Sequence, residues 1–171
     1  MMKLGRMVLV ALAFLTLGAF SAQAQRIATV DIQRMLESID DYNLAQESLD
    51  RIASTWRQEI AQEYDQIKGM YNKYQAEQVL LSDESRRQRE DEIMEREKQV
   101  RELQRRKFGP EGELFKRRQE LVKPIQDKVY EAIENYATDR GYDFIFDKAG
   151  SAGLIFSNGE YDKTDDIIRT F

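Results

Sequence analysis

Apolar side chains recur every three or four residues along most of the chain, starting at Ile32. The most regular part has seven-residue steps through Ile60, Ile67, Tyr74 and Leu81. An apolar stripe of this period is typical of a long helix that packs along a partner, as in the seam of a coiled coil. No proline lies between residues 25 and 106, so the backbone forces no break there, although Asp40-Asp41 could interrupt the helix locally.

A turn into a second helix is predicted at Ser82. Its hydroxyl oxygen can cap a new helix, and Asp83 and Glu84 would then lie in the first turn, where the helix dipole favours negative charge. Residues 83–107 carry 9 basic and 8 acidic side chains and only a few apolar ones. This composition indicates the solvated outer end of a thin two-helix arm, not the core of a globule.

The returning helix contains two predicted irregularities. The segment Phe108-Gly109-Pro110-Glu111-Gly112 should bend or break it, and Pro124 predicts a second kink. Gly141 is a natural C-terminal stop. The outgoing leg has 50 residues, from 32 to 81, and the returning leg has 58, from 83 to 140. At about 1.5 Å per residue they are about 75–85 Å long, which predicts an antiparallel hairpin.

Three short segments have the composition of strands, namely Arg26–Asp31, Tyr142–Asp147 and Leu154–Phe156. Thr164 should cap a short final helix. So small a sheet is at best marginally stable alone, and we therefore expect a homo-oligomer whose subunits join their sheets. The apolar side chains assigned to this oligomer body are Ile27, Val30, Phe144, Phe146, Leu154 and Phe156.

These elements predict a mainly α (α+β) fold. Residues 25–31 and 141–171 form a small β-sheet body, and residues 32–140 form a helical hairpin arm that turns near residue 82. The preceding residues 1–24 have the pattern of a secretory signal: a basic start, a run of 14 apolar residues too short to span a membrane, and Ala22-Gln23-Ala24 as the cleavage site. We expect an exported mature chain that begins at Gln25.

Composition excludes several kinds of chemistry. The chain has no histidine and no cysteine, so a Ser-His-Asp triad, a cysteine nucleophile and a typical zinc site are excluded. Asp143 and Asp147 are the one carboxylate pair considered for acid–base work, but strand-end charges that limit edge pairing explain them better. We expect no catalytic residues, no metal and no cofactor. A net charge of about −7 for residues 25–171 also argues against nucleic acid.

The order of these features resembles the Skp/OmpH family of periplasmic chaperones over essentially the whole mature chain. The resemblance rests on the strand ending in Val30-Asp31, on Pro124-Ile125 in the returning helix, and above all on two tail stretches, Gly141–Asp147 and Tyr161–Ile168. The hairpin itself is generic, because many coiled coils share its composition.

The resemblance implies a periplasmic homotrimer with a barrel-like body and helical arms that enclose a cavity. It also implies an ATP-independent holdase that binds unfolded outer-membrane proteins. The best-known members are strongly basic whereas this chain is acidic, which argues against contact with lipopolysaccharide or anionic membranes. The alternative is a structural coiled-coil scaffold or spacer of the cell envelope.

Five large side chains on the arm are candidates for contact with client proteins: Trp56, Tyr64, Met70, Tyr71 and Tyr74. Aromatic and methionine side chains suit promiscuous apolar contact because they are large or adaptable. The same side chains could instead hold the seam of the hairpin, and the stripe favours that role for Trp56 and Met70. Tyr64 and Tyr71 lie off the stripe or at its edge, and are the stronger candidates.

Overall fold

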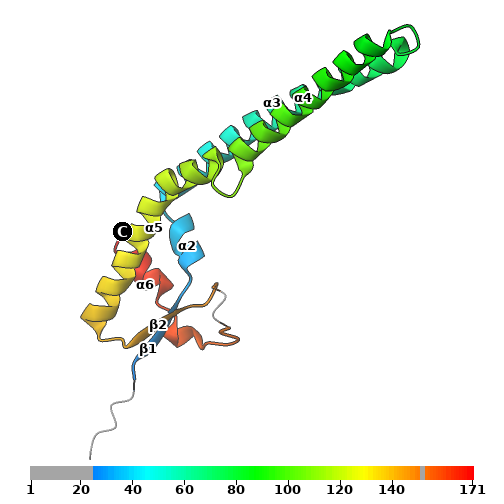
Figure 1. Ribbon diagram of the computed structural model, residues 1–171. Helices are drawn as coiled ribbons and strands as arrows, with labels where there is room; N and C mark the ends of the chain where they lie inside the picture. Colours follow the sequence, from blue (N-terminus) through cyan, green and yellow to red (C-terminus); the bar gives the residue numbers. More distant parts are fainter. Residues whose placement is uncertain (1–24, 151–152) are drawn as a thin grey trace, which may run out of the picture.

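The computed structural model describes residues 25–150 and 153–171, which form a long two-helix arm on a small body (Figure 1). The predicted export signal, residues 1–24, lies outside the described residues. The elements in chain order are β1 (Ile27–Val30), α2 (Ile32–Glu37), α3 (Asp40–Glu77), α4 (Asp83–Phe108), α5 (Glu113–Arg140), β2 (Phe144–Asp147), η1 (Gly159–Tyr161) and α6 (Thr164–Ile168). The predicted mainly α fold with a helical hairpin is confirmed.

The helix α4 begins at a polar side chain that satisfies a free backbone N–H group. Ser82 caps α4, since its Oγ accepts from the Ser85 N–H at 3.3 Å. The outgoing leg is interrupted at residues 38 and 39, between α2 and α3. Asp40 and Asp41 form the first turn of α3, where the helix dipole favours their charge. The acidic pair therefore starts the long helix and does not interrupt it.

A single seam of apolar side chains joins α3 to α4 in the outer arm. Its buried members are Ile60, Ile67, Ile93 and Val100, and its half-buried members are Met70, Tyr74, Leu103 and Phe108. An ion pair between Glu63 and Arg96 crosses the same helix pair. The seam is one side chain thick, so most of the helix surface around it faces solvent.

The returning leg is interrupted between Phe108 and Glu113, at the glycines that predicted a break there. A Cβ on Gly109 would lie 2.4 Å from the Arg105 carbonyl oxygen, and one on Gly112 would lie 2.8 Å from the Gly109 nitrogen. Only glycine therefore allows the loop of residues 109–112 to fold back so closely on the end of α4. In contrast, α5 runs through Pro124 as one helix.

The body is built on a parallel pairing of β1 with β2, in register from Ile27↔Phe144 to Val30↔Asp147. The expected strand Leu154–Phe156 does not form, and residues 153–158 have no regular secondary structure. Both edges of β1 are already occupied, because β1 pairs with β2 on one side and Thr29 bridges to Asp162 on the other. Residues 154–156 therefore find no edge of β1 to pair with.

A second core cluster fills the body and the lower arm. Its buried side chains are Val30, Met35, Leu36, Tyr42, Ala45, Leu49, Val122, Val129 and Ile167. Val30, one of the side chains assigned to the oligomer body, is only 1% exposed within this core. It packs under α2 and α6 because the inner face of so small a sheet needs helices to cover it.

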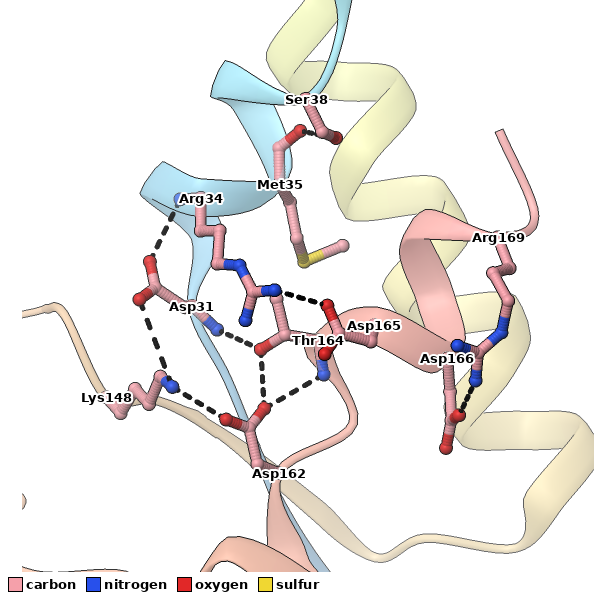
Figure 2. Close-up of polar contacts among 10 residues, drawn as sticks. All are labelled: Asp31, Arg34, Met35, Ser38, Lys148, Asp162, Thr164, Asp165, Asp166 and Arg169. Carbon is pink, nitrogen blue, oxygen red and sulfur yellow. Dashed lines mark hydrogen bonds and ion pairs between the residues drawn. The ribbon is translucent and has the colours of Figure 1, made fainter.

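A partly buried polar network fastens the C-terminal tail to the end of β1 (Figure 2). The Thr164 Oγ1 accepts from the Asp31 N–H at 2.9 Å. The Asp162 carboxylate accepts from the Thr164 N–H at 2.9 Å and from Lys148 Nζ at 2.6 Å. At the edge of the network, Arg34 pairs with Asp165 at 2.7 Å. The tail stretch Tyr161–Ile168 is thus held to the end of β1, to the residue after β2 and to α2.

The Asp162 carboxyl is the most strongly perturbed group of the network. Burial opposes its ionisation, but hydrogen bonds from Lys148 and from the hydroxyl and amide of Thr164 outweigh burial and lower its pKa to about 2. A carboxyl whose pKa falls on folding contributes stability that is fully present above its unfolded value, 3.8, and is lost as the pH falls towards 2.

We predict that Asp162→Asn lowers the free energy of unfolding by about 2 kcal/mol at pH 7. Urea unfolding of both proteins across pH 2–6 measures the difference, which should shrink between about pH 4 and pH 2. Asp127→Asn is the control, because that carboxylate is 59% exposed and paired only with Lys123 on the same helix. A difference that stays constant down to pH 2 would contradict this role of Asp162.

Candidate functional site

The outer face of the two-stranded sheet exposes large apolar side chains. Ile27, Phe144 and Phe146 are 40%, 48% and 39% exposed. Ile27 lies opposite Phe144 in the register, and the two phenylalanine rings stack with centroids 6.3 Å apart. We call these three side chains the sheet face. Nearby in sequence, Ile155 and Phe156 stand out almost fully exposed from the segment that forms no strand.

Three tyrosines of α3 reach across the hairpin to α4. The Tyr71 hydroxyl donates to Glu97 at 3.2 Å, the Tyr64 hydroxyl donates to Gln104 at 3.4 Å, and Tyr74 donates to Glu90. The hydrogen bond to Glu97 raises the pKa of Tyr71, and the one to Glu90 raises the pKa of Tyr74. The three hydrogen bonds tie these tyrosine side chains of α3 to α4.

The client-binding candidates differ in how much surface they offer. Tyr64 and Tyr71 are 42% and 41% exposed. Met70 and Tyr74 pack half-buried against the outer seam. Trp56 lies at the other end of this seam, in edge contact with Phe108. The structure thus leaves Tyr64 and Tyr71 as the accessible pair.

Sequence reasoning missed several exposed apolar side chains of the arm. The tip carries Val79 and Leu80, which are 83% and 84% exposed. Others lie along α4 and α5: Met94, Phe115, Leu121 and Tyr130. A helical-wheel projection could have found Met94 and Tyr130, because each directly follows a buried core position, Ile93 or Val129.

The junction of α4, the 109–112 loop and α5 packs on α3 through aromatic and charged side chains, and we call it the elbow. The Trp56 and Phe108 rings meet edge to face with centroids 6.1 Å apart. Lys107 Nζ lies 4.3 Å from the centre of the Trp56 ring and 2.6 Å from Glu113. This hydrogen bond from Lys107 lowers the pKa of Glu113. The elbow is therefore fastened to α3 although the returning leg is broken.

The carboxylates considered for acid–base work have structural roles. Asp143 accepts from the Arg26 N–H at 2.7 Å, and Asp147 accepts from the Ala149 N–H at 3.0 Å. Among the described residues, no three acidic side chains are placed to hold a metal ion. Over residues 25–150 and 153–171, no helix combines the length and apolarity needed to cross a membrane. What the structure offers instead is exposed apolar surface on an arm and on a sheet.

The architecture is that of a helical hairpin standing on a small sheet with a fastened C-terminal tail. A family model described as outer membrane protein (OmpH-like) matches residues 26–171, and the chain belongs to this family. A crystal structure of an OmpH-like protein of Caulobacter crescentus CB15, named as a candidate outer membrane chaperone, has a similar fold with a TM-score of 0.64. The two chains are 12% identical, and the match covers 88% of this chain and 85% of that one. No curated protein matches the chain.

We predict that Phe108→Ala lowers the free energy of unfolding by about 2 kcal/mol, because it removes a half-buried ring from the seam and its contact with Trp56. Urea unfolding followed by circular dichroism measures the change. Phe115→Ala is a matched control on the other side of the elbow loop, where the ring is 44% exposed. Equal effects of the two substitutions would contradict a fastened elbow.

Proposed function

We propose that the protein is an ATP-independent holdase of the periplasm that keeps unfolded outer-membrane proteins from aggregating. Membership of the OmpH-like family and a fold like that of a candidate outer membrane chaperone support a chaperone role. The observation that carries the proposal is the apolar surface of the arm: exposed rings and aliphatic side chains lie along a solvated hairpin whose seam needs none of them.

The binding energy in this proposal comes from many weak contacts. Covering a half-exposed tyrosine ring contributes on the order of 1 kcal/mol, so several contacts along one arm give useful affinity without fixing one client pose. Each contact breaks and reforms independently. Release then needs no nucleotide. A client that folds or binds elsewhere buries its apolar segments, and the equilibrium between bound and free client shifts towards the free form.

We further propose that three mature chains, each beginning at Gln25, join their bodies into a barrel-like trimer. The sheet face of Ile27, Phe144 and Phe146 supports this, since two strands alone form a marginal sheet. The outer edge of β2 and the unpaired segment 154–156 supply further surface for joining. The arms of such a trimer would surround a shared space.

A scaffold or spacer of the cell envelope is the second candidate. The length of α3 favours it, because 38 residues of unbroken helix make a stiff element about 57 Å long. A spacer requires no exposed apolar side chains on its outer surface. The two functions therefore differ in whether the arm binds unfolded chains at all.

We predict that the purified mature protein suppresses aggregation of an unfolded β-barrel protein without ATP, and that Tyr64→Ser with Tyr71→Ser weakens this activity severalfold by removing two exposed rings. Light scattering of the diluted client measures the suppression. Tyr64→Phe with Tyr71→Phe is the control, because it keeps the rings and removes only the hydrogen bonds to α4.

Three results of this assay are informative. Activity in the phenylalanine variant with loss in the serine variant supports ring contact. Equal loss in both variants indicates that the hydrogen bonds, which set the position of the arm, are what matters. An intact oligomer that never suppresses aggregation would favour the spacer.

Phe146→Asp should dissociate the oligomer, because it would place an unpaired charge within the joined sheets. Multi-angle light scattering measures the mass of the assembly. Tyr130→Asp is the control, with an aromatic side chain 54% exposed on the arm, away from the sheet. An assembly of normal mass for Phe146→Asp would count against joining through the sheet face.

A further inference from the structure

Charge is unevenly distributed along this acidic chain. Residues 105–123 carry seven basic and three acidic side chains, a local net charge of +4. The segments that form the body and the lower arm are acidic: residues 25–50 carry two basic and six acidic side chains, and residues 124–171 carry five and ten. The positive stretch coincides with the elbow, halfway along the arm.

Several cations of the elbow have no intramolecular partner. Lys107 pairs with Glu113 and Arg117 pairs with Glu120. Arg105, Arg106 and Lys116 form no ion pair with any described residue, and all three are exposed. The intramolecular network therefore leaves Arg118 and these three cationic groups free to meet a charge from outside.

These three side chains share one groove. The groove has a volume of about 870 Å³ and lies between the end of α4, the loop of residues 109–112 and the start of α5. Figure 1 shows this loop projecting from the middle of the arm. Glu102, Glu111 and Glu113 also line the groove, but the charge of Glu113 is matched by Lys107. Three free cations thus face two free carboxylates.

We propose that the elbow groove binds acidic segments of unfolded polypeptide. Guanidinium groups bind carboxylates through two parallel hydrogen bonds, so Arg105 and Arg106 suit clustered aspartate and glutamate better than isolated lysines would. Phe115, which directly precedes the groove residue Lys116 in α5, is 44% exposed and can cover an apolar neighbour of the acidic residues. This inference rests on the proposed function, because the occupant is part of a client.

The distribution of charge along the arm favours an extended peptide over a flat anionic membrane surface as the occupant of the groove. An extended peptide can reach the elbow without approaching the acidic body. A membrane surface that met the elbow along the arm would also face residues 25–50 and 124–171, which together carry a net charge of −9. Repulsion over that larger area opposes the attraction at the elbow.

The test measures binding of short, unstructured, fluorescent peptides to the full mature protein by anisotropy. One peptide has clustered aspartates and glutamates between apolar residues, and its twin has asparagines and glutamines in their place. The elbow variant is Arg105→Gln, Arg106→Gln and Lys116→Gln. The matched control is Lys68→Gln, Arg87→Gln and Lys98→Gln, which removes three exposed, unpaired cations elsewhere on the arm.

We expect the acidic peptide to bind tighter than its twin by about tenfold at low salt, and this preference to vanish in the elbow variant but persist in the control. Circular dichroism verifies that both variants fold. Equal affinity for the two peptides, or equal loss in both variants, would overturn the inference. So would binding of phosphatidylglycerol vesicles that depends on the elbow cations when the acidic peptide does not bind.

The aggregation assay separates this inference from the proposed function. If the wild-type protein suppresses aggregation but shows no preference for the acidic peptide, only the elbow inference fails. If the peptide binds at the elbow but no unfolded client is ever protected, the holdase function fails and the elbow is a peptide site of another kind.

Discussion

The parallel pairing of β1 with β2 is the constraint on which the rest of the fold depends. A parallel pair needs a crossover connection, and here that crossover is the whole arm. The returning leg must pass the start of β1 before β2 can run in the same direction. A four-residue strand is about 13 Å long, or about nine residues of helix, which is close to the excess of the 54 helical residues in α4 and α5 over the 44 in α2 and α3.

Local signals in the sequence predicted the arm well. Ser82 and the glycines at 109 and 112 act through their own backbone, so their positions could be recognised without knowing the partner helix. The body was harder to predict, because a strand exists only where an edge is free to pair. Leu154–Phe156 has the composition of a strand, but β2 and the bridge from Thr29 to Asp162 occupy both edges of β1. Val30 lies in the core of the body, beneath α2 and α6. Exposure at the tip, at Val79 and Leu80, depends on where the turn falls, which composition does not show.

The two ends of the molecule differ in chemical specificity. The body depends on directed contacts, such as those of Thr164 with Asp31 and of Asp162 with Lys148, which tolerate few substitutions. The arm depends on a thin apolar seam that many side chains could supply. This difference explains why the tail stretches resemble a family more specifically than the hairpin does. The seam also leaves the outer side chains of the arm without a packing role in it.

The unbroken α3 beside a returning leg that is interrupted at residues 109–112 gives the arm unequal stiffness in different directions. Bending towards the broken side presses the ends of α4 and α5 together, and the loop between them resists this compression only weakly. Bending the other way pulls the two ends apart and must first break the ion pair between Lys107 and Glu113, which joins them. The arm is therefore expected to bend most easily at the loop of residues 109–112, with its outer half moving towards the side on which α4 and α5 are interrupted.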